Sequence, residues 1–540
     1  MPPKRDETAS DTDSYTDSDS SPYTDSDTDS SSVSTPAPRA TIRGGAEVLD
    51  VKDHGLHAGG RHAALNDEQR AAVRAALAAR DYALIQGFPG AGKSATLAAI
   101  VRALVDTGKS VLVTSHTHGA VDNVLERLPG VGVDDGIVRA GGEGGKASVF
   151  AAAFCPGGTN HAARSVEELR RLADTARVVG ATCYAAANHP LIARRRARRD
   201  SETTETKKEP EPETGAFDVV LVDEAGQMTL PASVPALLRG AVYVLVGDPQ
   251  QLPPLVQSER AGAAGLATSP MQTLADAHPT AAFALRAQYR MADDLAKISN
   301  VISYRGRMRA ANDAVATRVM RSLLVNPETD VLRAFASSPA GLDPRDSPWL
   351  VAASDPARRV VFLDTSDCGA RAFETSGEGT VREGKAGPAR GSKHVNAYER
   401  GIVARVLAAL RARGAAPGSC AVLSPYNSQV DALASDLRRR EAATPQTEPP
   451  IPEGVEALTI DRAQGRDVDC VVLSFCRANA ARDAGRLLAD KRRLNVALTR
   501  ARSKLVLVGH GDTLRASPVL SQVLGVVLEN GWMFHLPPPA

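Results

Sequence analysis

One glycine-rich stretch constrains the fold of this chain more than any other part of the sequence. A short apolar run from Tyr82 to Ile85 is followed by GFPGAGKS and then by the apolar segment LAAIVRALV. The run predicts a buried strand, the last segment predicts a helix, and the residues between them fit G-x-x-x-x-G-K-[ST]. A glycine-rich turn without a ligand is the alternative. The flanking strand and helix favour a phosphate-binding loop, because that loop requires both.

The residues of this loop suit a nucleoside triphosphate with magnesium. Gly87, Gly90 and Gly92 are expected to let the backbone turn its N–H groups inward around the phosphates, where the next helix adds a positive field. We expect Lys93 to reach the β and γ phosphates and Ser94 to ligate Mg²⁺. ATP and Mg²⁺ are therefore the predicted cofactors.

The chain has enough residues for several domains, and its charge is unevenly distributed. It contains 540 residues, of which 43% are hydrophobic, and this predicts two or three globular domains. Residues 1–35 hold nine acidic and two basic residues, a net charge of −7, so the remainder carries +8. This basic excess is compatible with a nucleic-acid partner but does not by itself indicate one. Residues 1–45, rich in Ser, Thr and Asp, predict a disordered acidic tail that is a candidate docking segment for a protein partner.

Cysteine spacing and hydropathy argue against several classes of protein. The six cysteines show no C-x-x-C spacing, so we expect reduced thiols and neither a disulfide framework, a zinc site nor an iron–sulfur cluster. No apolar run is long enough to span a membrane, and the N-terminus is polar. We therefore expect an intracellular protein that does not associate with membranes.

Strand and helix signals alternate through most of the chain. An initial helix is expected near Leu65, with Asn66 as its cap and Gln69 in its first turn. Short β-branched runs then follow in two sets, at 111–114, 177–182, 218–222 and 242–246, and at 360–363, 420–424, 457–459, 470–475 and 504–509. This alternation predicts an α/β fold with parallel sheets covered on both faces, and the two sets predict two lobes.

Three polar stretches between these runs are expected to be loops or linkers. They are residues 194–214, 366–394 and 440–454. The first begins with five arginines and continues as an acidic segment, so solvated surface and a nucleic-acid patch are both open interpretations.

An acidic pair after the fourth predicted strand suits the other half of a nucleotide site. Asp223 and Glu224 follow the apolar run VVLV. An aspartate at this place can hold the Mg²⁺ that Ser94 ligates, and the adjacent glutamate can orient and deprotonate the attacking water. The same dipeptide is common on protein surfaces. Its position at the end of a buried strand, well after a phosphate-binding loop, favours the catalytic interpretation.

Other residues are candidates for sensing and stabilising the γ-phosphate. Gln251, in GDPQQLPP, is a candidate γ-phosphate sensor because an amide can bond either phosphate or water, although a proline-rich turn is an equal alternative. Arg290, Arg500 and, less favoured, Arg502 can supply positive charge to the transition state. If that charge comes from the second lobe, ATP hydrolysis and lobe movement become coupled.

The ordered set of motifs in the chain resembles a known family. It comprises LNDEQ, GFPGAGKS, TSHTHGAVDN, VDEAGQ, GDPQQLPP, QYRM, LSPYNSQ, TIDRAQGRDVDCVVLSF and DKRRLNVALTRARSKLVLVG. These resemble the motifs of superfamily 1B helicases over residues 62–515. Within that superfamily, HTHGAVDN, ATCYAAANHPL and QGRDVDC are most similar to the helicase core of the eukaryotic DNA replication ATP-dependent helicase/nuclease family. The related RNA helicases of nonsense-mediated decay and transcription termination share most of the other motifs.

The resemblance implies roles for individual residues. Gln69 is expected to read adenine and Tyr289 to pack near the base. Contacts with phosphate, metal or water are implied for Lys93, Ser94, Asp223, Glu224, Gln251, Arg290, Gly465 and Arg500. Contacts to a nucleic-acid strand are assigned to Thr117, His118, Thr182, Tyr426 and Thr459, for which ordinary capping, loop or core roles are the alternatives.

The chain also departs from the family pattern. No counterpart of the nuclease domain or of its cluster-binding cysteines is evident, and the small barrel domain that usually precedes or interrupts the core lacks room. Gly226 stands where serine is usual and Lys491 where an aromatic residue is frequent. We therefore expect a helicase module without nuclease, whose unwinding is weaker than its translocation.

These features together predict two tandem RecA-like P-loop NTPase domains, at 60–280 and 281–530. The predicted function is ATP-dependent translocation and unwinding, 5′ to 3′ on single-stranded DNA, in replication or repair in the nucleus. Two alternatives remain open at this point. One is an RNA or RNA–DNA hybrid helicase with the same engine, and the other is a nucleotide-dependent clamp that binds strands without productive unwinding.

Overall fold

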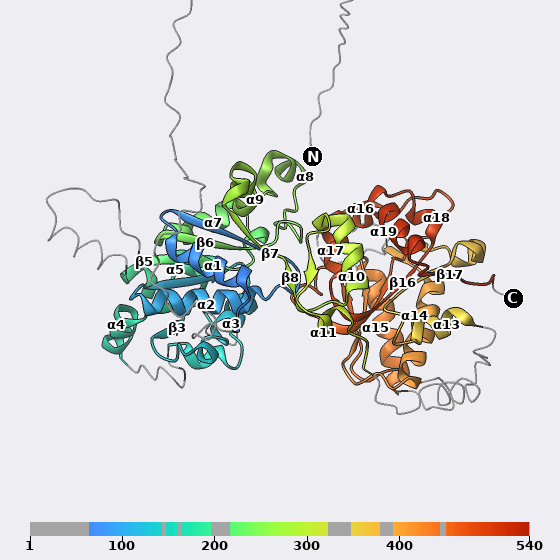
Figure 1. The fold of residues 1–540 in the computed structure, drawn as a ribbon, viewed down its shortest axis with the longest axis horizontal. Coiled ribbons are helices and arrows are strands. Elements are labelled where there is room, and N and C mark those ends of the chain that lie inside the picture. The colour runs from blue at the N-terminus through green and yellow to red at the C-terminus, as the bar shows by residue number, and fades with distance from the viewer. Residues whose placement is uncertain are drawn as a thin grey trace, which may run out of the picture. The chain divides into compact units, whose positions relative to one another are not determined.

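The computed structural model describes residues 64–142, 147–156, 158, 165–195, 216–321, 347–377, 393–442 and 450–538 (Figure 1). The predicted acidic tail and most of the arginine-rich stretch lie outside these residues. Two large sheets carry the described fold.

The first sheet has seven parallel strands in the spatial order β3-β4-β2-β5-β6-β1-β7. Its strands are β1 (Tyr82–Gly87), β2 (Val111–Ser115), β3 (Ile137–Arg139), β4 (Val178–Thr182), β5 (Phe217–Val222), β6 (Gly240–Gly247) and β7 (Ala282–Leu285). Successive strand residues enter different cores: Val111 and Val113 join one hydrophobic cluster, whereas Leu112 joins another. This alternation follows from the strand period of two and confirms a sheet covered on both faces.

Helices on the two faces of this sheet complete the two cores (Figure 1). One face is covered by α1 (Asp67–Ala78), α2 (Lys93–Asp106) and α3 (His118–Leu125). The other is covered by α5 (Cys183–Asn188), α7 (Leu230–Leu237) and α9 (Pro270–Ala277). The first helix begins as predicted, because the Asn66 side chain accepts the N–H of Gln69 and the Gln69 side chain accepts the N–H of Asn66.

The second sheet has six parallel strands in the order β14-β13-β15-β16-β10-β17. They are β10 (Val360–Asp364), β13 (Cys420–Ser424), β14 (Glu456–Thr459), β15 (Val468–Ser474), β16 (Ala501–Gly509) and β17 (Met533–His535). One face packs on α13 (Pro348–Ser354), α14 (Ala397–Ala412) and α15 (Asn427–Ala442). The other packs on α10 (Asp293–Ser299), α17 (Lys491–Leu498) and α19 (Pro518–Glu529).

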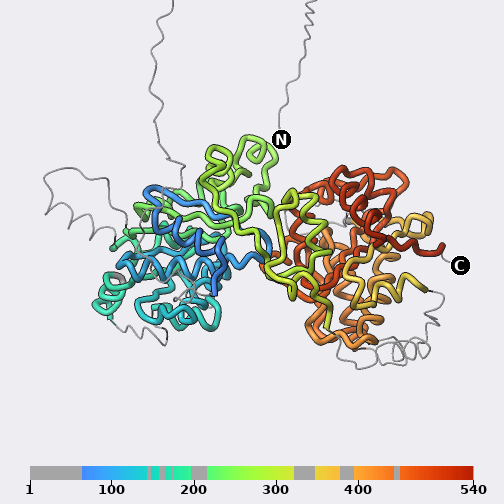
Figure 2. The backbone as a smooth tube through the Cα atoms, in the orientation of Figure 1, coloured from blue at the N-terminus to red at the C-terminus, as the bar shows by residue number. Residues whose placement is uncertain are grey.

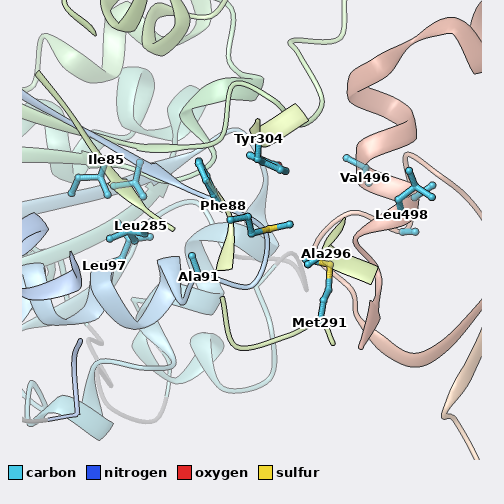
Figure 3. Packing of buried hydrophobic residues seen from close by; sticks show 14 of the residues in the cluster. Ile85, Phe88, Ala91, Leu97, Leu285, Met291, Ala296, Tyr304, Val496 and Leu498 are labelled. Atoms are coloured by element: carbon cyan, nitrogen blue, oxygen red, sulfur yellow. The ribbon is translucent and has the colours of Figure 1, made fainter. Parts of the chain in front are cut away.

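Residues 286–321, traced in Figure 2, follow the last strand of the first sheet and come before the strands of the second. This segment contains the short parallel pair β8 (Ala287–Gln288) and β9 (Arg309–Ala310), and a π-helical turn, η6 (Asn300–Tyr304). One continuous hydrophobic cluster joins it to both sheets. Figure 3 shows Phe88 and Tyr304 from this cluster close together, and Met291 beside Ala296. The rings of Phe88 and Tyr304 lie 4.5 Å apart between centroids.

All nine predicted strands after the phosphate-binding loop are present, but the strands at three sheet edges were not predicted. β3, β7 and β17 contain only three or four residues each, and β3 ends in a buried arginine, so none carries a clear β-branched run. Since β7 ends at Leu285, the first sheet extends past the boundary expected at residue 280.

Two of the three loop predictions are partly wrong. Residues 366–394 begin with the 3₁₀ turn η8 (Ser366–Ala372), and their ends form the antiparallel pair β11 (Thr375–Gly377) and β12 (Lys393–Val395). Residues 440–442 belong to the last turn of α15. In the arginine-rich stretch, the guanidinium of Arg195 lies 4.7 Å from the centre of the Phe217 ring, so this arginine packs on the protein itself.

All six cysteines are buried free thiols. Among the described helices, none has the length and apolar character needed to cross a bilayer.

A buried ion pair at the edge of the first sheet generates a stability prediction. Arg139 is fully buried, and its Nε donates to Asp122 Oδ1 at 2.7 Å. Replacing Arg139 with alanine leaves a buried carboxylate without its charge partner, so we expect the free energy of unfolding to fall by about 3–5 kcal/mol. The matched control is Arg515→Ala, whose pair with Asp512 is about 40% exposed on both sides and is expected to contribute ~1 kcal/mol or less. Urea unfolding of both variants tests this, and equal losses would contradict it.

Candidate functional site

A cavity of about 1690 Å³ is lined by loops that follow the strands of both sheets. Most of the predicted nucleotide-site residues line it: Gly90, Gly92, Lys93, Ser94, Asp223, Glu224, Gln251, Tyr289, Arg290, Gly465 and Arg500. Thr117 lines it as well. The other predicted residues, Gln69, Gly87, His118, Thr182, Tyr426 and Thr459, are not among its lining residues. The carboxyl ends of parallel strands are where ligands bind in open α/β sheets, and this cavity occupies that position.

The phosphate-binding loop runs from the end of β1 to the start of α2, and its glycines have two different roles. Gly90 and Gly92 have φ of 72° and 78°, in the left-handed region that side chains disfavour. A Cβ on Gly90 would lie 2.5 Å from the Cβ of Arg290. Gly87, which was also predicted to permit a turn, has no positive φ. It instead leaves room for the side chain of Lys93, since a Cβ there would lie 2.2 Å from the Lys93 Cγ.

The Lys93 side chain folds back into its own loop. Its Nζ donates to the carbonyl oxygen of Gly87 at 3.0 Å. This contact holds the ammonium group at the cavity wall beside Ser94, the first-turn hydroxyl of α2. Both groups therefore face the space that a phosphate chain would fill.

Asp223 and Glu224 are held at the end of β5 in an unusual backbone conformation. Glu224 has φ of 52°, and its N–H donates to Asp223 Oδ1 at 2.9 Å. A non-glycine residue in this region stores strain, which is typical of functional sites. Burial raises the pKa of Asp223, and Glu224 raises it further, while Lys93 opposes the shift. A buried carboxylate with this cost of ionisation is suited to a divalent cation, and Ser94 lines the same cavity, so the two residues fit the predicted Mg²⁺ site.

The predicted arginines approach the cavity from the segments near the second sheet. Arg290 Nη1 donates to the carbonyl oxygen of Thr499 at 3.1 Å, and its Nε lies 3.5 Å from Asp467. Arg500 donates through Nε to Val496 at 2.9 Å and through Nη2 to the Thr499 hydroxyl at 2.9 Å.

The surroundings of these two arginines favour an anion. Burial and the nearby Arg290 together lower the pKa of Arg500 to about 9, against the opposing effect of Glu224. Burial also lowers the pKa of Arg290. Two buried cations that disfavour each other are stabilised by a bound negative group such as a phosphate. Arg502 also lines the cavity, but it is less buried and donates to Asp467 Oδ2 at 2.7 Å.

The predicted sensor, Gln251, is buried, and its amide orientation is fixed. Its Nε2 donates to Asp248 Oδ2 at 2.9 Å. The amide oxygen is consequently the end of the side chain left for water or phosphate.

The predicted base-binding residues form one hydrogen-bonded group with the phosphate-binding loop. Gln69 Nε2 donates to the carbonyl oxygen of Ala91 at 3.1 Å. The Tyr289 N–H donates to the carbonyl oxygen of Gly90 at 2.8 Å, and the Tyr289 hydroxyl accepts from Asn66 Nδ2 at 2.8 Å. Asn66, predicted only as a helix cap, thus also positions Tyr289, a contact between distant residues that no local pattern signals.

The predicted strand-contacting residues lie where parallel strands end. Thr117 and His118 follow β2, and Thr182 ends the neighbouring strand β4. In the second sheet, Tyr426 follows β13 and Thr459 ends its neighbour β14. The two sheets therefore present equivalent sets at their carboxyl edges.

Each of these residues also has a local structural role. Thr117 and Thr182 accept the N–H of Ala120 and Ala185 as helix caps, and Thr459 accepts the N–H of Arg462, each at 3.3 Å. Arg139 Nη2 lies 2.9 Å from the Nδ1 of His118. The Tyr426 ring packs edge-on against His394 with centroids 5.1 Å apart, and burial raises its pKa to about 12. The capping threonines keep their own O–H groups as donors, so the two roles are compatible.

The chain is similar to two family models and to several known proteins. Two family models, both described as AAA domain, match residues 64–312 and 266–512. The chain is 35% identical over 480 residues to the DNA replication ATP-dependent helicase/nuclease JHS1 of Arabidopsis thaliana, covering 88% of this chain and 30% of the relative. It is 33% identical over 476 residues to the DNA replication ATP-dependent helicase/nuclease DNA2 of Mus musculus, covering 88% and 40%.

The chain thus spans only about a third of the length of these relatives. Among solved structures, the arterivirus nonstructural protein 10 (helicase) is 12% identical, with a TM-score of 0.36 over 84% of this chain and 63% of that one. That likeness is too weak to add to the argument.

The contact between Gly90 and Arg290 generates a prediction. Gly90→Ala and Gly108→Ala both place a side chain at positive φ, at a cost of about 1–2 kcal/mol each. Nothing lies within 4 Å of the new Cβ at Gly108, whereas at Gly90 it meets Arg290. We therefore expect Gly90→Ala to lose more stability than Gly108→Ala, and only Gly90→Ala to bind an ATP analogue at least about tenfold more weakly. Thermal unfolding and fluorescent-nucleotide titration measure both, and equal affinities would contradict the expectation.

Proposed function

We propose that this chain, which is similar to the DNA replication ATP-dependent helicase/nucleases, is an ATP-driven translocase and helicase on single-stranded DNA. We place its work in DNA replication or repair in the nucleus, with 5′ to 3′ travel. Its two RecA-like domains meet near residue 286, where the first sheet has ended.

The observation that carries this proposal is the composition of one cavity. Lys93, Asp223 and Glu224, at the ends of first-sheet strands, share it with Arg290 and Arg500, which contact Thr499 beside the second sheet. An ATP site completed by residues of a second domain changes when that domain moves. This arrangement supports coupling between ATP hydrolysis and movement of the second domain.

The residues have distinct roles in the proposed hydrolysis. Lys93, Arg290 and Arg500 stabilise the negative charge on the γ-phosphate in the transition state. Glu224 accepts a proton from the attacking water, and the amide oxygen of Gln251 orients that water. Ser94 and Asp223 would hold Mg²⁺, which neutralises phosphate charge when bound.

The proposed strand path follows the carboxyl edges of both sheets. Thr117, His118 and Thr182 contact the strand from the first sheet, and Tyr426 and Thr459 contact it from the second. Hydroxyl groups suit the phosphodiester backbone, and the aromatic ring suits a base face, so the path reads little sequence. The acidic tail is proposed to bind a protein partner.

Substitution of the catalytic groups tests the proposed engine. We expect Lys93→Ala to abolish ATP hydrolysis and Glu224→Gln to lower kcat by about 10²–10⁴ through loss of the general base, while Glu224→Gln retains ATP binding. Lys109→Ala, which removes a lysine just after α2, is the control expected to hydrolyse ATP normally. Steady-state phosphate release measures all three. Normal hydrolysis by either of the first two variants would refute the assignment.

The proposed substrate is tested by comparing polymers. ATPase activity is measured without polymer, with single-stranded DNA and with RNA of the same length at the same salt concentration, because phosphate contacts are strongly salt-dependent. We expect stimulation by DNA above that by RNA, and displacement of a strand from a duplex with a 5′ overhang. Greater stimulation by RNA would instead support an RNA helicase, and ATPase without displacement would support a clamp.

A further inference from the structure

A buried tyrosine joins the proposed sensor loop to the helix that precedes Arg500. Tyr304 ends the π-helical turn η6 and is fully buried, and its ring packs on Phe88 of the phosphate-binding loop (Figure 3). None of the proposed roles in ATP hydrolysis uses its hydroxyl group. The hydrogen bonds of this hydroxyl group are therefore not explained by the proposed catalytic roles.

On one side the hydroxyl contacts the loop after β6. It donates to Asp248 Oδ2 at 2.7 Å, and the same oxygen accepts the Gln251 Nε2 at 2.9 Å. The carboxylate of Asp248 thus holds both groups. Burial and this carboxylate raise the pKa of Tyr304 well above its ordinary value, so the hydroxyl keeps its proton and remains a donor.

On the other side the hydroxyl contacts α17. It accepts a hydrogen bond from Asn495 Nδ2 at 2.7 Å, and the same amide nitrogen donates to the carbonyl oxygen of Gln250 at 2.9 Å. The next residue of the helix, Val496, accepts the Arg500 Nε, and Thr499 bonds both Arg500 and Arg290. The helix that Tyr304 contacts is therefore the one that positions the arginines.

We propose that Tyr304 is a positioning residue that fixes Gln251 and Arg500 relative to each other through Asp248 and Asn495. The proposal rests on the function proposed above. In the proposed reaction Gln251 orients the attacking water and Arg500 stabilises the charge on the γ-phosphate, so the two must be in place together. A displaced α17 breaks the Asn495 contact and releases the loop that carries Gln251. Hydrolysis then occurs only when the second domain is in position.

The test removes the hydroxyl and leaves the ring. We expect Tyr304→Phe to keep its packing on Phe88, to leave the KM for ATP unchanged and to lower DNA-stimulated kcat by about tenfold, as expected for one buried hydrogen-bonded link. The matched control is Tyr82→Phe. The Tyr82 hydroxyl is buried with no hydrogen-bond partner among the described residues, and we expect this variant to hydrolyse ATP normally.

A second variant separates positioning from a loss of structure. We expect Asn495→Ala, like Tyr304→Phe, to lower kcat and to leave the KM for ATP unchanged. The double variant Tyr304→Phe, Asn495→Ala is expected to be no slower than the slower single variant, because both substitutions remove the same hydrogen-bonded link. Additive losses, a raised KM or a normal kcat in Tyr304→Phe would each overturn the proposal. An inactive wild-type protein would instead refute the proposed function itself. If Tyr304→Phe unfolds, Asn495→Ala alone still tests whether kcat falls while the KM for ATP stays unchanged.

Discussion

The close approach of Gly90 to Arg290 is the contact on which the candidate site depends. The absence of a side chain at Gly90 lets the loop that faces the phosphates touch the segment leading to the second sheet, and the Tyr289 N–H bonds the Gly90 carbonyl at 2.8 Å. From there Arg290 reaches the carbonyl oxygen of Thr499, beside Arg500. One backbone contact thus brings the groups of a first-sheet loop and of a second-sheet helix into the same cavity.

Electrostatics give this cavity its preference for a charged ligand. On one wall a buried carboxylate, Asp223, is costly to ionise, and on the other burial lowers the pKa of two guanidinium groups, those of Arg290 and Arg500. Each set is stabilised by the part of a magnesium nucleotide that carries the opposite charge. The site therefore stores an unfavourable charge arrangement that its proposed ligand relieves, and the strained backbone of Glu224 fits the same interpretation.

Local patterns predicted much of the fold and of the nucleotide site, and contacts between distant residues account for what they missed. Strands such as β2 and β5 are continuous buried runs, and a loop with two positive-φ glycines has a fixed spacing, so both are visible in sequence. The edge strand β3 was missed because a buried arginine interrupts its apolar character. The role of Gly87 was misjudged because it depends on where the Lys93 side chain folds. Tyr304 is hydrogen-bonded to Asp248, which is 56 positions away in the sequence, and to Asn495, which is 191 positions away. No local sequence pattern indicates such contacts.

The central claim is that residues of both domains act on one nucleotide. The most direct measurement is an experimental structure of the protein with a slowly hydrolysed ATP analogue, Mg²⁺ and single-stranded DNA. We expect Lys93, Arg290 and Arg500 all to contact the γ-phosphate in that structure. A γ-phosphate contacted only by residues of the first sheet, with Arg500 still bonded to Val496 and Thr499, would contradict it.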